Sequence, residues 1–385
     1  MSDPFPRGRT AIVSTATHGI KGADGADAME LLSVAALTAL KRAGLRPSDV
    51  DGLFCGLPLD FLSGLTVSEY LGVSPRMTNN NRTGGSSFMT HVMSAAFALD
   101  AGFCDVALVA YGSAQRSEAG KLQTPPKLDP IEGGYKLRYP IGSYALAAAR
   151  HMHEFGTTRE QFAEVAVAAR GWANLNPQAF AQGPLEIADV LEARMVCDPL
   201  TVRDCCLVTD GAAALVMTRA DRARDHTSAP VFVLGAGEAT THARISQMPD
   251  LTVSGAVQSG ARAYAAAGVG PGDIDVVQLY DAFTFNTILF LEDLGFCGKG
   301  EGGPFIAGGR IAPGGSLPVN TNGGGLSCVH PGMYGLFGLA EAVDQLAGRC
   351  EEVRQIKDAE VALAHGNGGT LSSQATVILG TDATL

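Results

Sequence analysis

The chain has 385 residues, of which 46% are apolar and 17% charged, and its formal net charge at pH 7 is −11. This negative balance excludes the broad electropositive face by which proteins bind nucleic acid or anionic membranes. No apolar run approaches the roughly 20 residues of a membrane span. The length exceeds what one small core fills, so we expect two packed core units, or one duplicated architecture with an inserted region.

The cysteines and the first residues bear on the cellular compartment. The eight cysteines contain no CxxC pair, so we expect reduced thiols and no metal site. The opening residues, MSDPFPRGRTAIV, lack the charged and then apolar build of a signal peptide. We therefore expect a cytoplasmic protein.

An internal repeat organises the chain. Residues 37–56 read LTALKRAGLRPSDVDGLFCG, and residues 261–281 read ARAYAAAGVGPGDIDVVQLYD. In both copies an Ala-rich helical stretch ends at Ala-Gly, passes a Pro-x-Asp turn and enters a short apolar strand. The copies have a constant offset of 224 residues, as from Pro47 to Pro271.

The elements that follow the repeat also correspond. The segment RTGGSS, from Arg82, leads into a predicted helix through Gly102 and a strand over residues 105–112. Its counterpart is NGGGL, from Asn322, with a helix through Ala347 and a strand over residues 360–368. Each half is predicted to be a strand–helix–strand–helix–strand unit with a mainly parallel sheet, and the two α/β halves are predicted to stack face to face.

An insertion separates the halves. Residues 114–200 contain a polar, proline-bearing stretch and helices, the longest opened by a capping box of Thr158 and Gln161. Residues 210–218 return to the first sheet, and Pro230 opens the second half. We expect residues 1–113 and 201–228 to form the first half, residues 114–200 an inserted loop domain over the site, and residues 229–385 the second half.

Four motifs carry a family resemblance that covers essentially the whole chain. They are Tyr280-Asp-Ala-Phe-Thr, LEDLGFCGKGEGG, VNTNGGGLSCVHPG around His330, and His365-Gly-Asn-Gly-Gly. Together they resemble the thiolase superfamily, in its sterol carrier protein x and lipid-transfer-protein branch. The resemblance implies a thiolase fold, a duplicated five-stranded αβαβα layered architecture, and acyl-CoA thioesters as substrates.

The chain departs from thiolases at both of their cysteines. Thiolases use one cysteine as acyl acceptor at a helix start, where the helix dipole favours a thiolate, a second as acid/base, and a histidine in Gly-His-Pro. Here the first position falls at Gly85 or nearer Arg82, and the second at His365. His330 matches the family histidine, although Val329 replaces the glycine. Acyl transfer through a cysteine thioester is therefore unsupported.

Two tyrosines suggest another reaction. Tyr280 and Tyr334 resemble those of the lipid-transfer-protein type of steroid side-chain aldolase, which cleaves a β-hydroxyacyl-CoA to a ketone and a shorter acyl-CoA. Such a carbon–carbon lyase (retro-aldolase) needs a base on the β-hydroxyl, donors for the enolate oxygen and an acid for carbon. A tyrosine can serve as base if neighbouring donors or cations lower its pKa from about 10.

The predicted roles follow from this chemistry. Tyr280 and Tyr334 transfer protons, His330 and the backbone near Gly84 or Gly85 bind the enolate oxygen, and His365 is a second acid/base candidate. The Gly-rich segments lack the P-loop and dinucleotide patterns, so we interpret them as close backbone approach to the thioester. The predicted substrate and CoA contacts are Gly84, Gly85, Ser86, Asn322, Gly324 and Gly368. No cofactor is expected beyond the CoA of the substrate, and the basic residues available for its phosphates are Arg82, Lys121, Lys127, Lys136 and Arg138.

Several alternatives stay open at this point. The tyrosines and histidines could serve packing, with His365 only capping the Gly turn. Cys328, on the same side of a strand as His330, or Ser86 and Ser87 could be unorthodox nucleophiles of an acyltransferase, although the serines also suit a helix cap. A third possibility is a non-catalytic CoA-ester binding subunit.

The resemblance also implies partners. Thiolase-fold proteins pair their first-half sheets across a dimer axis, which predicts a homodimer. The aldolase relatives act with an acyl-CoA-associated protein carrying an OB fold and often a zinc ribbon. The acyl group is left open between a steroid, a terpenoid and an aromatic side chain, with a steroid suggested by the family.

Overall fold

The computed structural model describes residues 5–119 and 130–385. The first half contains β1 (Thr10–His18), α1 (Ala28–Arg42), β2 (Gly52–Gly56), α2 (Ser63–Leu71), β3 (Met77–Asn79), α3 (Ser87–Asp100), β4 (Val106–Ser113) and β7 (Gly211–Arg219). The insertion contains α4 (Gln115–Ala119), α5 (Pro130–Gly134), α6 (Ile141–Phe155), α7 (Arg159–Leu175), α8 (Ile187–Leu191), β5 (Met195–Cys197) and β6 (Leu200–Thr201). The second half contains β8 (Val231–Thr240), α9 (Ala256–Ala267), β9 (Val276–Leu279), α10 (Thr284–Asp293), α11 (Gly302–Ile306), the π-helical turn η6 (Gly324–Cys328), α12 (Gly335–Leu346), β10 (Val361–Gly368) and β11 (Ser373–Gly380).

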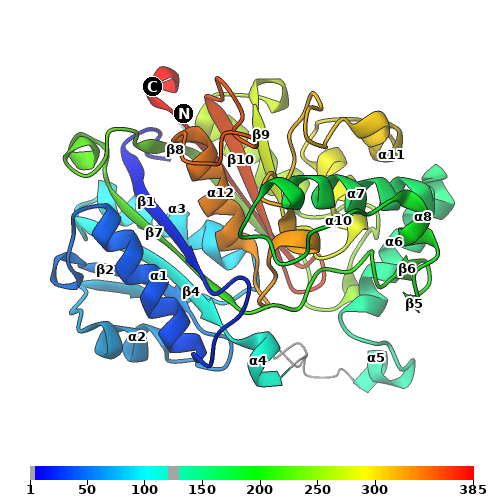
Figure 1. Ribbon diagram of the computed structural model, residues 1–385, viewed down its shortest axis with the longest axis horizontal. Helices are drawn as coiled ribbons and strands as arrows, with labels where there is room; N and C mark the ends of the chain where they lie inside the picture. The colour runs from blue at the N-terminus through cyan, green and yellow to red at the C-terminus, as the bar shows by residue number, and fades with distance from the viewer. Residues whose placement is uncertain (1–4, 120–129) are drawn as a thin grey trace.

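In the described part of the chain, nine strands form one continuous sheet, β5 and β6 form a small separate one, and the two halves of the large sheet share a layer of helices. Helices α3 and α12 contact each other and strands of both halves, so they form the middle layer, while α1 covers the outer face of the first half of the sheet and α9 that of the second. Figure 1 shows α12 between the two groups of strands. The two halves of the sheet join where β1 and β8 pair over two residue pairs, giving the order β3-β2-β4-β7-β1-β8-β11-β10-β9. This is the predicted αβαβα layering of a thiolase fold.

The strand directions differ from the prediction of a mainly parallel sheet. The helical crossovers through α3 and α12 make β2 parallel to β4 and β9 parallel to β10, as predicted. The last strand of each half, however, inserts in the reverse direction: β7 between β4 and β1, and β11 between β10 and β8. The short turn at residues 369–372 can only reverse the chain between β10 and β11, and with β7 also reversed most ladders are antiparallel.

The internal repeat is confirmed down to single hydrogen bonds. In the first half, the Asp51 carboxylate accepts the backbone N–H groups of Asp105 and Val106 at the start of β4. In the second half, Asp275, 224 residues later, accepts those of Glu360 and Val361 at the start of β10. In both copies an aspartate before one parallel strand satisfies donors at the start of the next one, which explains the shared Asp of the repeat.

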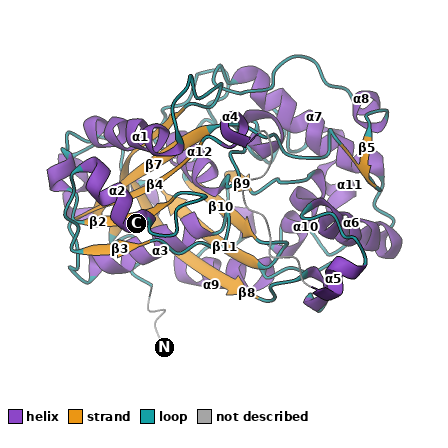
Figure 2. Ribbon diagram, turned by 90° about the horizontal axis from the view of Figure 1, so that it is seen from below, coloured by secondary structure: helices purple, strands orange, loops and turns teal. Residues whose placement is uncertain are grey.

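The insertion gathers at one end of the molecule with α10 and α11, as Figure 2 shows. Its helix α7 begins at the predicted capping box, since the Thr158 hydroxyl accepts from Gln161 N–H and the Gln161 side chain accepts from Thr158 N–H. The insertion also touches the turn after β10, because the Tyr144 hydroxyl donates to Gly369 O at 3.1 Å. The domain boundaries given above stay predictions. Within the described residues, no helix is long and apolar enough to cross a membrane.

Candidate active site

Tyr280 and Tyr334 meet in the interior, one directly after β9 and the other directly before α12. Their rings lie edge to face with centroids 5.9 Å apart. The Tyr280 hydroxyl accepts from the Tyr334 backbone N–H at 3.4 Å and donates to Gly332 O at 3.3 Å. The Tyr334 hydroxyl donates to Asn322 Oδ1 at 3.0 Å. The structure therefore brings together the two residues that the sequence assigned to proton transfer.

The pKa values of these phenols are raised, whereas proton transfer as predicted from the sequence required them to be lowered. Burial raises the pKa of both Tyr280 and Tyr334 well above the usual value. Asn322 presents its carbonyl oxygen to Tyr334, and the loss of water outweighs the neighbouring donors. Both phenols are thus protonated at neutral pH, and the expected lowering of their pKa is wrong for the unliganded site.

His330 lies beside Tyr280, with ring centroids 5.5 Å apart. Its side chain is buried, and neither ring nitrogen has a hydrogen-bond partner within the described residues. Burial lowers the pKa of His330 to about 4, so the imidazole is neutral at pH 7. Buried polar atoms normally find partners, so two unpartnered ring nitrogens indicate a place for ligand or water. His330 is therefore not a structural histidine whose ring nitrogens are hydrogen-bonded within the described part of the protein core.

Gly85, the predicted position of a thiolase nucleophile, has no room for a side chain. A Cβ built there would lie 1.8 Å from Tyr280 Cε2 and 2.5 Å from its Cδ2. Real Cβ atoms do not approach other carbons this closely, so the Tyr280 ring occupies the space of a side chain at position 85. A cysteine at this position and the Tyr280 ring exclude each other in this conformation.

Gly84 and Gly368 bring the two halves into backbone contact. Gly84 has a left-handed φ of 99°, and a Cβ on it would lie 2.8 Å from Gly368 Cα. A Cβ on Gly368 would lie 1.8 Å from Thr83 O. Both glycines are therefore required for close approach of one backbone to the other. Their predicted contact with substrate stays a prediction.

The hydroxyls at the start of α3 are engaged within the protein. Ser86 Oγ is buried and lies 2.9 Å from both Ser373 Oγ and Thr83 Oγ1. Ser87 Oγ accepts the Thr83 backbone N–H at 2.8 Å. A serine nucleophile needs a hydrogen bond to a base such as histidine, and neither Ser86 nor Ser87 bonds to a ring nitrogen of His330. The structure gives no support to Ser86 as a nucleophile or as a group open to ligand.

His365 does not join the tyrosines. Its Nδ1 lies 2.9 Å from Thr376 Oγ1 and its Nε2 lies 3.0 Å from Gln374 Oε1, both on the neighbouring β11. Thr376 in turn contacts Ser259 of α9, which places His365 on the outer face of the sheet. Successive residues of a strand face opposite sides, so it is Gly366 that points toward α3. The assignment of His365 as acid/base is corrected to a buried structural residue.

The residue of β10 that faces the site is therefore Gly366. A Cβ there would lie 2.6 Å from Met89 Sδ and 2.9 Å from Gly85 O. Both positions from which a reactive side chain could reach this space, 85 on the α3 side and 366 on β10, are glycines. The glycine-rich turn alone led to the prediction of His365 for the second cysteine position, and only the strand register shows that Gly366 is the residue that faces α3.

Cys328 is a poor nucleophile in this arrangement. Its thiol is buried at the end of η6, 3.6 Å from Asn176 Nδ2. Burial raises the pKa of the Cys328 thiol well above its usual value, and Glu341 adds to the increase. A nucleophilic cysteine needs the thiolate, which this setting disfavours.

The turn between Asn322 and His330 is held by an aspartate that sequence reasoning missed. Asp281 Oδ1 accepts Gly325 N–H at 2.6 Å and its Oδ2 accepts Leu326 N–H at 3.3 Å. Gly324 has a φ of 64°, and a Cβ there would lie 2.1 Å from Asp281 Oδ2. Burial raises the pKa of Asp281 to about 7. The position of Asp281 directly after Tyr280 was the one feature of the sequence that could have marked it as part of the site.

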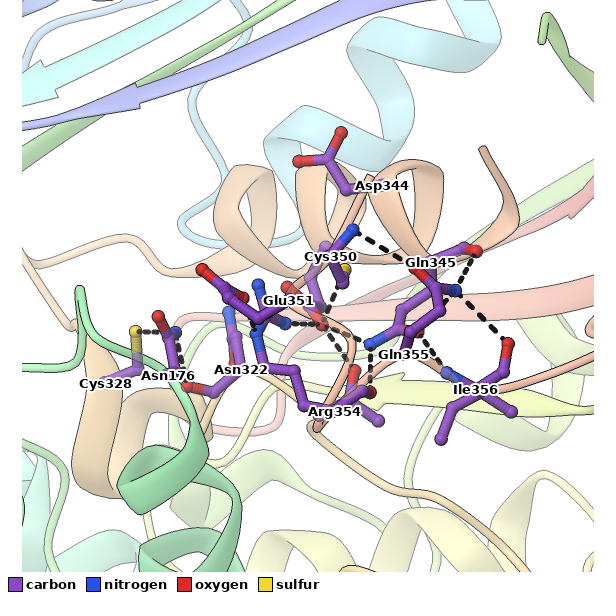
Figure 3. Close-up of polar contacts among 12 residues, drawn as sticks. Asn176, Asn322, Cys328, Asp344, Gln345, Cys350, Glu351, Arg354, Gln355 and Ile356 are labelled. Atoms are coloured by element: carbon purple, nitrogen blue, oxygen red, sulfur yellow. Dashed lines mark hydrogen bonds and ion pairs between the residues drawn. The ribbon is translucent and has the colours of Figure 1, made fainter. Parts of the chain in front are cut away.

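A buried ion pair supports the same turn from behind. Glu341 Oε1 accepts the Thr321 hydroxyl at 2.6 Å and lies 2.5 Å from Arg354 Nη1. Gln345 Nε2 donates to the same oxygen at 2.9 Å. Figure 3 shows Arg354 and Gln345 on one side of Asn322, with Asn176 and Cys328 on the other. Asn322, whose Oδ1 also accepts Gly324 N–H at 2.7 Å, is thus fixed to receive Tyr334.

The basic residues proposed for CoA phosphates are not gathered. Arg82 Nη1 donates to Leu57 O and Pro58 O, at 2.9 and 3.0 Å, so its charge fastens a loop. Lys136 and Arg138 are exposed near α5. Lys121 and Lys127 lie outside the described residues.

Comparisons with known proteins identify the family. The pattern of the thiolase C-terminal domain-like family matches residues 237–381. The chain is 35% identical to 17-hydroxy-3-oxo-4-pregnene-20-carboxyl-CoA lyase of Mycobacterium tuberculosis over 89% of this chain and 92% of that protein. It is 33% identical to a steroid side-chain-cleaving aldolase of Thermomonospora curvata over 97% and 98%, and 32% identical to an acetyl-CoA acetyltransferase of Methanothermobacter thermautotrophicus over 89% and 91%.

The chain belongs to the thiolase superfamily. A solved structure described as an Ltp2-ChsH2(DUF35) aldolase superposes with a TM-score of 0.88 at 32% identity, covering 98% of each chain. The predicted thiolase fold and the resemblance to the aldolase members of the superfamily are both confirmed. No comparison assigns roles to single residues of this chain, so the roles of Tyr280, Tyr334 and His330 stay predictions.

Proposed function

We propose that this chain is a carbon–carbon lyase that cleaves a β-hydroxyacyl-CoA into a ketone and a shorter acyl-CoA. The observation that carries the proposal is the Tyr280 ring in the space of a side chain at Gly85. Where a thiolase has the cysteine that forms a thioester with the enzyme, this chain has a glycine whose side-chain space is filled by a phenol ring. The relatives named as a lyase and as an aldolase, each aligned along most of the chain, support the same reaction.

The reaction needs no external reactant. The Cα–Cβ bond breaks as the β-hydroxyl loses its proton and becomes a ketone, and the bonding electrons pass to the thioester as an enolate. The enolate carbon then gains one proton, so the proton lost from oxygen balances the one gained by carbon. No covalent enzyme intermediate is required, in agreement with glycine at positions 85 and 366.

The tyrosines suit a relay of that proton. Burial keeps both phenols protonated. A tyrosine can therefore accept the proton of the β-hydroxyl only while that tyrosine, or the other one, donates its own proton to the enolate carbon. The two rings are in edge-to-face contact, while the Tyr280 hydroxyl lies at the Tyr334 backbone N–H and the Tyr334 hydroxyl at Asn322 Oδ1. Neutral His330, with free ring nitrogens, and the backbone N–H groups at Gly85 are proposed to bind the enolate oxygen.

The acyl group is proposed to be steroid-like. Two relatives carry steroid substrates in their names. In this chain the insertion touches the site from outside, through Asn176 Nδ2 to Asn322 O at 2.9 Å and through the Tyr144 ring, 4.5 Å from that of Phe283. The insertion is therefore the segment expected to select the acyl group.

The test is a cleavage assay without free CoA. The purified chain, with its partner protein, receives a tertiary β-hydroxyacyl-CoA bearing a steroid or an aromatic side chain, and products are followed by mass spectrometry. Ketone plus shortened acyl-CoA is the expected result. Cleavage of a β-ketoacyl-CoA that begins only when CoA is added would show thiolase chemistry and refute the proposal.

One observation favours a second candidate. The relative named acetyl-CoA acetyltransferase is 32% identical along most of the chain. An acyltransferase would need an acyl acceptor, and Cys328 is buried with a raised pKa. A mass increase of the intact protein after mixing with acyl-CoA would favour this candidate. Saturable binding of acyl-CoA without any turnover would instead favour a non-catalytic subunit.

A partner protein is also proposed. The similar aldolase structure pairs Ltp2 with ChsH2, a DUF35 protein. An OB-fold and zinc-ribbon partner of that kind is expected for this chain, and co-purification with a neighbouring gene product would test it. The cytoplasmic location expected from the sequence stays a prediction.

The proposed homodimer has a suitable face. Strand β3 is an edge strand of the sheet, and an unpaired edge can pair with a second copy. Large apolar side chains are exposed between β2 and β3: Leu59 (69% exposed), Phe61 (74%), Leu65 (65%) and Tyr70 (56%). Apolar groups gathered in this way mark interfaces. Light scattering of the wild type and of Phe61→Asp should show a dimer and a monomer, respectively.

A further inference from the structure

Two arginines are buried among the described residues, and only one of them has carboxylate partners there. Arg354, 8% exposed, forms ion pairs with Glu341 and Glu351. Arg170, 7% exposed, has no carboxylate partner within residues 5–119 and 130–385. Its one hydrogen bond runs from Nε to the neutral hydroxyl of Ser327 at 3.1 Å. Buried charges are normally paired, so Arg170 calls for an explanation.

The charged end of Arg170 is open. Its two Nη nitrogens have no hydrogen-bond partner in the described part of the chain, yet they are not among the side-chain atoms sealed from solvent. A planar guanidinium with its stem packed and its fork free is suited to receive an oxyanion from outside. The structure thus provides a donor without an acceptor.

A second arginine adds to the positive charge. Arg203 is exposed, and its side chain forms no ion pair in the described part of the chain. Burial lowers the pKa of Arg170, and the charge of Arg203 lowers it further. The acidic residue next to Arg203 in sequence is Asp204, and its carboxylate accepts the hydroxyls of Thr201 and Thr284, at 2.8 Å each. Within the described residues, two guanidinium groups that lack a carboxylate partner favour a bound anion.

This pair borders the candidate active site. Ser327, the partner of Arg170, belongs to η6, the turn that Asp281 holds at Gly325 and Leu326. The segment after Arg203 runs along the same site, because Cys206 N–H donates to Ala282 O and Leu207 N–H donates to Gly325 O, both at 2.9 Å. A ligand on the two arginines would therefore lie at the rim of the same site.

We propose that Arg170 and Arg203 form a binding site for an anionic group of the thioester ligand, either a phosphate of its CoA or a carboxylate on its acyl chain. The proposal rests on the proposed function in that the ligand is an acyl-CoA. Both sources share the chemistry of an oxyanion accepting from the guanidinium fork. Arg170 belongs to α7 of the insertion, and Arg203 lies just after the insertion.

The test uses Arg170→Met, which keeps the length of the stem and removes the charge, and Arg203→Gln. The control Arg222→Gln removes one charge from the short helical segment at residues 220–225, away from α7. Binding of CoA, butyryl-CoA and succinyl-CoA to the full chain is measured by calorimetry, together with the melting temperature. Arg170→Met is expected to melt at or above the wild-type temperature, because it removes an unpaired buried charge.

The binding arms distinguish the two sources. If the anion is a CoA phosphate, Arg170→Met weakens all three ligands by about tenfold or more, as for a lost charge-assisted hydrogen bond. If the anion is an acyl carboxylate, only succinyl-CoA weakens, and the wild-type preference for it over butyryl-CoA disappears. Arg203→Gln, which is exposed and should fold normally, is expected to give a smaller loss in the same arm.

Affinities within about twofold of wild type for all three ligands in both folded variants would overturn the proposal, since a lost charge-assisted contact costs far more. So would a large fall in melting temperature of Arg170→Met with unchanged affinity, because that marks a structural role. The readout needs no turnover. A wild type that binds CoA through Arg170 but cleaves no β-hydroxyacyl-CoA would retain this site and lose the proposed function.

Discussion

The two halves of the chain share one framework but contribute unlike groups to the candidate site. Tyr280 follows β9, and the residue 224 positions earlier, at the end of β2, is Gly56. Helix α12 begins behind Tyr334, whereas α3 begins behind Gly85 and Ser86. The second half supplies the phenols and the imidazole, and the first half supplies backbone and space.

This difference shows what a duplicated fold preserves. The aspartates that anchor the parallel strands, Asp51 and Asp275, are the same in both halves because the sheet needs them. The residues around the site are free to diverge, with the condition that they fit one another. A glycine at position 85 and the ring at position 280 are one such fitted pair.

The strongest way to break the comparison is to remove a phenol from the second half. Tyr280→Phe and Tyr334→Phe should each lower kcat for lyase cleavage by about a hundredfold or more, as for an acid/base group. Tyr264→Phe, which removes a hydroxyl bonded to Leu294 O outside the site, is the matched control. Losses below about tenfold in both variants would rule out proton transfer by these residues.

The contacts that support the Asn322 turn and those at the start of α3 should contribute unequally to the free energy of unfolding. Glu341→Ala leaves Arg354 without this buried partner, so urea denaturation should show a loss of about 3–5 kcal/mol in unfolding free energy. Ser373→Ala removes the hydroxyl that meets Ser86 on the first-half side and should cost about 1 kcal/mol. Glu352→Ala, at an exposed position nearby, is the control. Equal losses for Glu341→Ala and Ser373→Ala would contradict the contrast.

The fitted pair can be tested against its repeat counterpart. A Cβ at Gly85 would overlap Tyr280, while at Gly56 the nearest atom, Met333 Cε, is 4.0 Å away. Gly85→Ala should therefore cost about 1–3 kcal/mol and most of the activity, as for an overpacked core. Gly56→Ala should change neither. Activity assays and melting curves of the two variants decide the matter, and a harmless Gly85→Ala would mean that Tyr280 is mobile.

The smallest expected effect is on acid stability. Burial lowers the pKa of His330 to about 4, so between pH 6.5 and 4 the unfolded chain binds more protons than the folded one, and stability falls as the pH falls. His330→Asn should reduce this loss by on the order of 1 kcal/mol at pH 5.5, measured by denaturation across the window. His91→Asn in the first half should behave alike, since burial also lowers the pKa of His91 to about 4. A pH dependence identical to wild type in His330→Asn would show that its pKa is not depressed.

The sequence predicted the framework because local patterns encode it. The repeat and the helix starts at Thr158 and near Ser86 follow from spacing, whereas the pairing of Tyr280 with Tyr334 followed from the resemblance to the aldolases. The face of β10 did not, because a one-residue shift exchanges His365 for Gly366 and only strand register decides between them. The raised pKa of the tyrosines and the role of Asp281 depend on burial by distant segments, which no local pattern contains.

The hydrogen bond between Ser86 and Ser373 joins residues separated by 287 positions. Together with the backbone approach of Gly84 to Gly368, it closes the candidate site with the hairpin of β10 and β11. During synthesis the tyrosines and His330 are therefore made well before the surface that encloses them. The site is therefore enclosed only after β11 has been made, so products truncated before β11 would carry the tyrosines and His330 without the strand that encloses them.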